Sequence, residues 1–355
     1  MRSFIKGVKI DGIASAVPTE WMSLQEQFSD ADDNKKNEIK KFIKKTGVTG
    51  RFLAGPRQTA SDLCYIAADK LLSEKKIDRN NIGVLVFVTQ TEDYRSPASA
   101  MVIHYRLGLA ESCIAFDVNL GCSGFTCGIN IASSLLLNSY SDYALLLCGD
   151  TSAREKNPAK KEFVSNADSM LFGDSGTATL LVKDNMAPDM KFISATRGSG
   201  YNMIITPYEW YRNPVTRGDG VNYMDGVEVF NFSTTDVPIM IKNLMQETEN
   251  TPDDYDCIVL HQANKMIINR IAKLTGFSDD KTIQSIDKFG NTSSASIPNT
   301  LVYNYGSESE GIMHCIMCGY GVGLSWSVVD CYIDKDDILP LIKTDVYFED
   351  DYYVE

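Results

Sequence analysis

Apolar residues follow two spacings along the chain, and their alternation predicts an α/β protein. Continuous apolar runs are typical of strands buried on both faces, and they cover residues 82–89, 116–122, 143–148, 177–182, 256–260, 311–318 and 323–329. Apolar positions three and four apart indicate helices, and they cover residues 59–75, 98–107, 128–137, 265–274 and a stretch reaching Tyr303. A lysine-rich helix is expected over 34–45, ending at Gly47, and Ser61 is the expected cap of the helix over 59–75.

The order of these elements occurs twice. In each half a strand, a helix, a turn of small residues, a second helix and two strands follow one another, with Cys122 and Asn291 at corresponding turns. This repetition predicts an internal duplication of two α/β halves, residues 1–185 and 186–355. Reactive groups in such folds gather at the carboxyl ends of the strands, so these turns are the first places to look for chemistry.

Composition and charge narrow the class of protein. A chain of 355 residues with 44% hydrophobic and 23% charged residues suits a folded globular protein of two domains or one duplicated unit. The net charge of −13 argues against non-specific binding to nucleic acid and against adhesion to anionic lipid. The first ten residues alternate like a strand and lack the apolar core of a signal peptide. No apolar run is long enough to predict membrane insertion.

The cysteines point to a reducing compartment. Nine cysteines without a secretory signal indicate free thiols and a cytoplasmic protein. Cys315 and Cys318 form a CxxC, but no second cysteine pair and no paired histidines lie at zinc spacing. We therefore expect no metal site.

Cys122 is the first candidate for a reactive group. Its turn between a strand and a helix would present the thiol above the sheet edge, and the helix N-terminus favours a thiolate with a lowered pKa. A small buried thiol packed beside glycines is the alternative. His261 closes a strand and Asn291 lies in a Gly-Asn-Thr turn, while His104 falls mid-helix and His314 mid-strand. If Cys122 has a base partner, His261 is the best placed.

Six motifs in chain order carry a resemblance to a known family. Cys122 in Asn-Leu-Gly-Cys-Ser-Gly, His261 in His-Gln-Ala-Asn and Asn291 in Gly-Asn-Thr-Ser-Ser resemble the Cys-His-Asn triad of the β-ketoacyl-[acyl carrier protein] synthase III family of the thiolase superfamily. The stretches at 172–176 (FGDSG), 224–230 (MDGVEVF) and 319–326 (GYGVGLSW) agree with it. The resemblance implies a thiolase-like fold, with two duplicated βαβαβαββ halves in a five-layer α-β-α-β-α arrangement, and a homodimer.

The resemblance also implies a chemistry. The Cys122 thiolate would attack an acyl thioester and hold the acyl group. Backbone N–H groups of Cys122 and Val322 would form the oxyanion hole, although the family usually has glycine in place of Val322. His261 and Asn291 would bind a malonyl thioester, whose decarboxylation gives the carbanion that attacks acyl-Cys122. The substrates would be acyl-CoA or acyl-ACP and malonyl-ACP, with acyl carrier protein (ACP) as partner and no cofactor.

Some positions depart from the family pattern. Lys41 and Lys45 replace a tryptophan and an arginine that grip coenzyme A, and lysine neither stacks nor binds bidentately as they do. Met266 replaces an arginine that contacts acyl carrier protein, but Lys265 and Arg270 remain close by as a local positive patch. A solvated helix face is the alternative interpretation of that patch.

The remaining features concern the acyl group and two peripheral segments. Ser96 stands before Pro97 where the family often has phenylalanine, which predicts a longer or differently shaped acyl pocket. Tyr320 in the last motif is a further candidate for substrate contact. The loop over 201–223 is expected to cover the site, and the acidic tail over 345–355 has no assigned function.

These observations favour a synthase III-like acyltransferase that forms a carbon–carbon bond, in a specialised lipid or secondary-metabolite pathway. The alternative is an acyltransferase that passes the group from Cys122 to an O or N nucleophile without decarboxylation. The intact pair of His261 and Asn291 argues against it. A non-catalytic partner subunit or acyl-binding module is a third hypothesis, which the presence of Cys122 disfavours.

Overall fold

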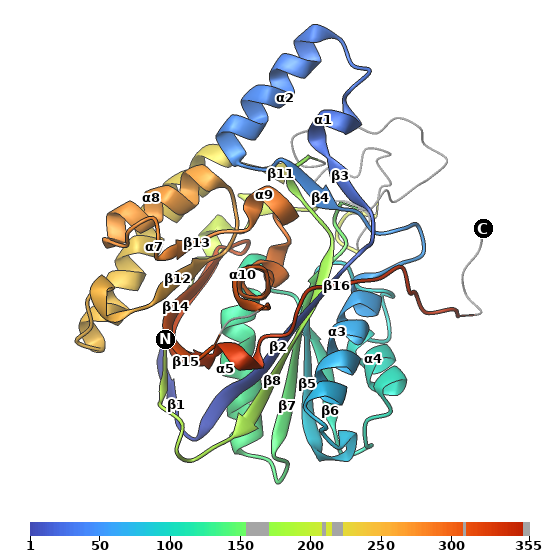
Figure 1. The fold of residues 1–355 in the computed structure, drawn as a ribbon, viewed down its shortest axis with the longest axis vertical. Helices are drawn as coiled ribbons and strands as arrows, with labels where there is room; N and C mark the ends of the chain where they lie inside the picture. The colour runs from blue at the N-terminus through green and yellow to red at the C-terminus, as the bar shows by residue number, and fades with distance from the viewer. Residues whose placement is uncertain (154–169, 208–210, 215–222, 308–309, 351–355) are drawn as a thin grey trace.

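The computed structural model describes residues 1–153, 170–207, 211–214, 223–307 and 310–350. Within these residues two six-stranded sheets form the centre of the molecule (Figure 1). In spatial order, the first contains β16 (Ile342–Lys343), β2 (Val8–Val17), β8 (Ser175–Lys183), β7 (Tyr143–Asp150), β5 (Ile82–Val88) and β6 (Ile114–Val118). The second contains β1 (Arg2–Ile5), β9 (Met190–Thr196), β15 (Ser325–Asp334), β14 (Ile312–Gly321), β12 (Cys257–Leu260) and β13 (Thr282–Ile283).

Three layers of helices enclose these sheets. The outer face of the first sheet is covered by α3 (Ala60–Glu74) and α4 (Ser99–Leu107). The outer face of the second is covered by α7 (Gly226–Glu247) and α8 (Lys265–Thr275). Between the sheets lie α5 (Gly124–Leu137) and α10 (Ser296–Tyr305). The α/β class and the five-layer α-β-α-β-α arrangement are therefore confirmed.

Further elements surround this framework. The helices among them are α1 (Leu24–Gln27), α2 (Asp33–Thr46) and α9 (Ile286–Phe289). The short strand pairs are β3 (Trp21–Ser23) with β4 (Gly50–Phe52), and β10 (Ile204–Ile205) with β11 (Tyr223–Met224). Single 3-10 turns are η1 (Arg79–Asn81), η2 (Gly121–Ser123), η3 (Gly198–Gly200), η4 (Pro252–Asp254), η5 (Ser293–Ala295) and η6 (Lys335–Asp337).

The core between the sheets forms because the two central helices are apolar on more than one side. Phe125 and Ile129 of α5, with Ile297 and Leu301 of α10, are almost completely buried there. A helix that is covered on opposite sides carries few polar side chains. Burying each large apolar side chain contributes about 1.5–3 kcal/mol. This packing holds the amino ends of α5 and α10, and the turns that precede them, in fixed positions.

The segment before Cys122 is shorter than the strand expected over 116–122. Strand β6 ends at Val118, and η2 follows before α5 begins. Gly121 has a φ of +52°, a left-handed conformation that glycine adopts without steric cost. This conformation ends the extended run early, so the predicted end of the strand is wrong. The predicted order of strand, turn and helix, with Cys122 at the turn, is confirmed.

Two further details near the amino terminus correct the sequence-based prediction. Thr59, not Ser61, caps α3, because the Asp62 carboxylate accepts the backbone N–H of Thr59 at 2.8 Å in a capping box and Ser61 lies inside the helix. Residues 1–10 form two strands, because Gly7 has a φ of +71° and ends the first. The cap of α2 agrees with the prediction, since Gly47 adopts a φ of +84° directly after it.

The strand at each end of the chain joins the sheet that is formed mainly by the other half of the chain. β1 pairs with β9 of the second sheet, while β16 runs parallel to β2 of the first. The division into halves at residue 185 stays a prediction, and these two strands cross it. The acidic tail packs on the first half, where Phe348 N donates to Asp62 Oδ1 at 2.8 Å. Its last five residues lie outside the described part of the chain.

The described residues contain neither a candidate membrane-spanning helix nor a candidate metal site. None of these helices combines the length and hydropathy that crossing a membrane requires. No group of three or more His, Cys, Asp or Glu side chains in the described ranges could hold a metal ion. The loop predicted over 201–223 lies partly outside these ranges, and its described ends pair as β10 and β11.

Candidate active site

Cys122 lies in η2, where glycines allow three segments to meet. A Cβ on Gly121 would lie 2.3 Å from Gln90 Oε1, and a Cβ on Gly321 would lie 2.7 Å from the Cβ of Cys122. Real Cβ atoms do not approach so closely, so only glycine lets the end of β14 come this near. Cys122 itself is half-buried. The backbone of Gly321 therefore lies directly against the Cys122 side chain.

Hydrogen-bond donors surround the Cys122 thiol. The backbone N–H groups of Val322 and of Cys122 itself, with the hydroxyl of Ser293, favour the thiolate. Burial acts against them and has the larger effect, so the pKa of the Cys122 thiol is raised to about 11. The prediction that the helix N-terminus lowers this pKa is wrong. The helix terminus is present, but the cost of desolvating a thiolate exceeds its contribution.

The chain positions His261 at the end of β12 through its backbone and its ring. His261 N donates to Cys318 O at 2.8 Å, and its Nδ1 lies 2.7 Å from Ser296 Oγ at the start of α10. The hydroxyl of Tyr320 donates to His261 O at 3.1 Å, and the two rings meet edge to face. Only 1% of His261 is exposed, and this burial lowers its pKa to about 3. A hydrogen bond to the backbone of Ser293 acts to raise the pKa, but its effect is smaller. The imidazole is neutral at physiological pH.

Asn291 is held by the segment of the FGDSG motif. Asn291 N donates to Leu171 O at 2.8 Å, and Gly173 N donates to Asn291 O at 3.1 Å, so the backbone is fixed in both directions. The side-chain Oδ1 of Asn291 accepts Ser293 N at 2.9 Å. This contact assigns the amide orientation and leaves the Nδ2 group as a donor.

One residue links all three members of the predicted triad. Ser293 donates its N–H to Asn291 Oδ1, its backbone bonds the ring of His261, and its hydroxyl neighbours the Cys122 thiol. It has a φ of +51° although it is not a glycine, and it is 5% exposed. A residue other than glycine keeps a positive φ only where the surrounding structure holds its backbone in place. The structure thus brings Cys122, His261 and Asn291 to one place.

Val322, Tyr320 and Ser96, the other uncharged residues predicted for the site, differ in how deeply they are buried. Val322 is partly buried, and its Cγ1 points at Gly121, 2.8 Å from where a Cβ would stand. Tyr320 is 1% exposed and packs behind His261. Ser96 is exposed, next to a cis bond to Pro97. Their contacts with substrate remain predictions.

The predicted basic residues lie on two helices in contact. Lys45 is exposed at the end of α2, and Lys265 and Arg270 are exposed on α8. A Cβ on Gly47, which ends α2, would lie 2.8 Å from the Cβ of Lys265, so the helices meet there (Figure 1). The basic residues Lys45, Lys265 and Arg270 therefore lie on adjoining helices.

Sequence reasoning missed two polar residues beside the triad. Ser293 lies in the turn quoted for Asn291, but nothing in its spacing separates it from the neighbouring serines. Asp150 ends β7 and is 1% exposed. The rule that reactive groups gather at the carboxyl ends of strands would have pointed to Asp150.

Comparisons with known proteins agree with this geometry. Residues 116–199 match the family model of 3-oxoacyl-[acyl-carrier-protein] synthase III, and residues 245–330 match its C-terminal model. The β-ketoacyl-[acyl-carrier-protein] synthase III of Sphingopyxis alaskensis is 31% identical over 293 residues, 82% of this chain and 88% of that protein. The crystal structure of a 3-oxoacyl-(acyl-carrier protein) synthase from Burkholderia xenovorans matches with a TM-score of 0.89 at 30% identity, covering 97% of this chain and 99% of that one.

A more distant structure shares the fold alone. The priming β-ketosynthase of the R1128 polyketide pathway matches with a TM-score of 0.79 at 23% identity, covering 95% of this chain and 97% of that one. The two structural matches extend over nearly the whole chain, and the match to the Sphingopyxis protein over 82% of it. The chain therefore belongs to the β-ketoacyl-[acyl-carrier-protein] synthase III family of condensing acyltransferases and has their thiolase fold.

Proposed function

We propose that Cys122 takes an acyl group from an acyl thioester and that His261 and Asn291 then direct its condensation with a malonyl thioester. The observation that carries this proposal is the convergence of donors at Cys122. The N–H groups of Cys122 and Val322 both reach the sulfur, so they lie close enough to donate to the carbonyl oxygen of an acyl group held on that sulfur. Removing one such donor typically costs about 2.7–4 kcal/mol of transition-state stabilisation.

The second step uses neutral donors. The lowered pKa of His261 keeps its imidazole uncharged, and the Ser293 contact leaves the Asn291 Nδ2 group free to donate. Both would bind the thioester carbonyl of the malonyl unit. Loss of carbon dioxide would leave an enolate on that oxygen, and its carbon would attack the acyl group on Cys122, forming the carbon–carbon bond and releasing the Cys122 sulfur.

Acyl carrier protein is the proposed partner, and the surface shared by α2 and α8 is its proposed docking site. Lys45, Lys265 and Arg270 are exposed there, on a chain whose net charge is −13. A local positive surface of this kind attracts an acidic partner. Changing Lys265 and Arg270 to Glu should raise KM for malonyl-ACP about tenfold or more and leave kcat unchanged, whereas Lys6→Glu on the β1–β2 turn should change neither.

A homodimer is the proposed assembly. Strand β6 is the edge of the first sheet and leads directly to the turn of Cys122. Ile114 at its start is 53% exposed, and Met101 and Tyr105 of the adjacent α4 are 47% and 75% exposed. An exposed apolar strand edge invites pairing with a second copy. Light scattering should give twice the chain mass, and Ile114→Lys should shift it toward one chain mass; a single chain mass for the natural protein would refute the dimer.

The pathway and compartment are part of the same proposal. Lys41 and Lys45 stand in place of residues that grip coenzyme A, and Ser96 stands in place of a phenylalanine. These replacements favour an acyl group other than the acetyl primer, and with it a specialised pathway. All nine cysteines are free thiols, which suits the reducing cytoplasm.

The test is intact-protein mass spectrometry after incubation with a panel of acyl thioesters, followed by malonyl-ACP. We expect a mass gain from one acyl group, its loss on adding malonyl-ACP, and release of carbon dioxide. Cys122→Ala should show no gain. Cys127→Ala is the matched control, because Cys127 is also half-buried but lies within α5, and it should behave like the natural protein.

Other outcomes would replace the proposal. Discharge of the acyl group by an amine or alcohol, but not by malonyl-ACP, would identify a non-decarboxylative acyltransferase. If no donor loads an acyl group onto Cys122, the non-catalytic partner subunit is the remaining hypothesis.

A further inference from the structure

Asn299 of α10 is a fully buried polar residue that the proposed chemistry does not use. Its Oδ1 accepts the hydroxyl of Ser15 on β2. Its Nδ2 donates to the hydroxyl of Ser175 on β8 at 2.8 Å and to that of Thr292 at 2.9 Å. These three partners are buried as well, so one amide joins three separate segments inside the protein. An apolar side chain of similar size would need no partners there, so what the amide adds is its hydrogen bonds.

The amide of Asn299 reaches the candidate site through Thr292. The backbone of Asn291 is held by residues 171–173, but its side chain is oriented by a different contact, the N–H of Ser293 on Asn291 Oδ1 at 2.9 Å. Thr292 lies between these two residues, so its backbone angles decide where that N–H points. Because Asn299 holds the side chain of Thr292, the direction of the Asn291 Nδ2 group depends on Asn299.

The same helix also holds His261. The hydroxyl of Ser296, the first residue of α10, lies 2.7 Å from His261 Nδ1. Asn299 follows Ser296 by three residues, which is almost one helical turn. The helix lies between the two sheets, with its apolar side chains almost completely buried. Two side chains on one rigid helix therefore hold the ring of His261 and the turn that orients Asn291.

We propose that Asn299 is a positioning residue that directs the Asn291 amide toward the same thioester carbonyl as His261. This inference rests on the proposed function of His261 and Asn291 in condensation. Two donors that share one oxygen must both be aimed at it, and a displacement of about 1 Å can cost about 100-fold in rate. Acyl loading does not need this alignment, because the N–H groups proposed for it belong to Cys122 and Val322, on segments other than those that Asn299 binds.

The experiment measures the two half-reactions separately in the natural protein, Asn299→Leu and Thr292→Val. Each change removes hydrogen bonds with little change in side-chain volume. Acyl loading on Cys122 is followed by rapid quench and intact mass, and condensation by release of carbon dioxide from malonyl-ACP. Both variants should condense about 10–100-fold more slowly, with loading rates within about threefold of the natural protein. Thr292→Ser keeps the hydroxyl and should restore most of the condensation rate.

Hydrogen exchange of the Ser293 amide gives a readout that does not depend on activity. This N–H is hydrogen-bonded to Asn291 Oδ1, and a bond that is less well held opens more often. In Asn299→Leu and Thr292→Val the Ser293 amide should exchange at least about tenfold faster than in the natural protein.

Thr177→Val is the matched control. Thr177 lies on β8, two residues after Ser175, and its buried hydroxyl donates to Cys148 O at 2.9 Å. The variant therefore also loses a buried hydrogen bond, but in a different contact. Its loading, its condensation rate per folded molecule and the exchange of Ser293 should all match the natural protein.

Three results would overturn the proposal. Unchanged condensation in Asn299→Leu and Thr292→Val is the first, and a parallel loss of loading and condensation, which marks a purely structural role, is the second. Slower condensation with unchanged exchange of Ser293 is the third, because it excludes the route through Thr292. If Asn299→Leu does not fold, the valine and serine variants of Thr292 decide. Absence of condensation in the natural protein would count against the proposed function itself.

Discussion

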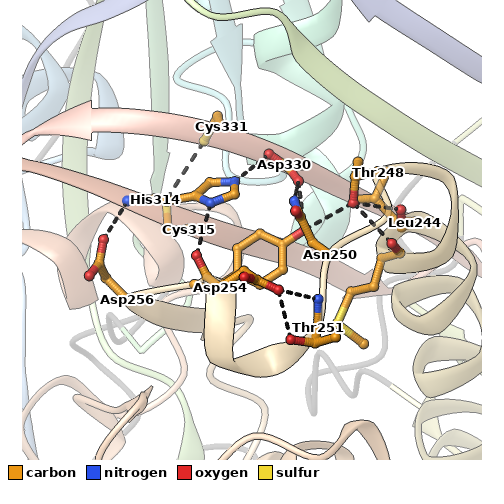
Figure 2. A network of polar contacts seen from close by, with 12 residues as sticks. Leu244, Thr248, Asn250, Thr251, Asp254, Asp256, His314, Cys315, Asp330 and Cys331 are labelled. Carbon is orange, nitrogen blue, oxygen red and sulfur yellow. Dashed lines mark hydrogen bonds and ion pairs between the residues drawn. The ribbon is translucent and has the colours of Figure 1, made fainter.

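Two histidines at the second sheet have contrasting surroundings. His261 directly follows β12 and is almost fully buried, and its Nδ1 lies 2.7 Å from the neutral hydroxyl of Ser296. His314 lies near the start of β14, where Nε2 is 2.8 Å from Asp330 Oδ1 and Nδ1 is 3.2 Å from Asp254 O (Figure 2). The ring of His314 stacks on Tyr332 at 4.2 Å.

These surroundings move the two pKa values in opposite directions. Burial lowers both, but at His314 the hydrogen bond and charge of Asp330 together outweigh it and the pKa is raised. At His261 no carboxylate opposes burial and the pKa falls to about 3. The same residue type therefore gives a neutral donor for the proposed chemistry in one place and, in the other, an imidazole whose protonated form is favoured by its carboxylate partner. One carboxylate within hydrogen-bond distance decides between them.

The strongest test of this contrast is His261→Ala. Removing a neutral donor from the proposed site should lower the condensation rate by about 10²–10⁴-fold while acyl loading on Cys122 persists. Since the pKa of His261 is lower in the folded protein than its ordinary 6.5, the natural protein loses stability as pH falls from 6.5 toward 3. The variant should be relieved of that loss.

His104→Ala is the matched control for His261→Ala. His104 contacts Ala110 O at 3.0 Å on α4, away from the second sheet, and its loss should leave the rate unchanged. Steady-state kinetics and urea unfolding at pH 5 and 7 give both readouts. A similar loss of rate in both variants would show that His261 has no special role.

The next effect in size is expected for Asp330→Ala. Asp330 Oδ2 also accepts the hydroxyl of Tyr255 at 2.6 Å, so the change removes one hydrogen-bond partner from each of His314 and Tyr255. Breaking a buried pair in this way costs about 3 kcal/mol of the free energy of unfolding. Activity per folded molecule should not change, because Asp330 contacts His314, Tyr255 and Asn250 and not the proposed triad. Unfolding in urea measures the cost, and Asp189→Ala at an exposed ion pair should cost less than about 1 kcal/mol.

The third prediction concerns the pH dependence of the His314 cluster. A histidine whose pKa is higher in the folded state stabilises the fold fully below its unfolded pKa of 6.5, and this contribution is lost as pH rises through the folded value. The difference in free energy of unfolding between the natural protein and His314→Asn should therefore be larger at pH 5.5 than at pH 9. A difference that is constant over this range would mean that the ion pair contributes nothing.

The smallest effect is expected for Ser296→Ala, which removes the hydroxyl 2.7 Å from His261 Nδ1. One neutral hydrogen bond contributes about 0.5–1.5 kcal/mol, so the condensation rate should fall about two- to twelvefold. Ser296→Thr keeps the hydroxyl and should restore most of the rate. Equal rates for the alanine and threonine variants, both below the natural protein, would assign the effect to packing.

Much of the local structure could be predicted from the chain because it depends on neighbouring residues. The apolar runs around residues 82–89 and 143–148 became β5 and β7, and Gly47 ended α2 as expected. The cap of α3 was misplaced because Thr59 and Ser61 are both acceptable caps, and only the carboxylate of Asp62 distinguishes them. The end of β6 was misplaced because the conformation of Gly121 depends on contacts with Gln90 and Val322.

The sequence by itself determined the order of elements, the turn that carries Cys122 and the residue types at the strand ends. Spacing and glycine positions encode these features over a few residues. Only the tertiary structure decided the protonation of Cys122 and His261, the contact of Ser293 with all three triad members, and the position of Asp150 behind them. These depend on burial and on groups brought together from separate segments of the chain, which no local pattern contains.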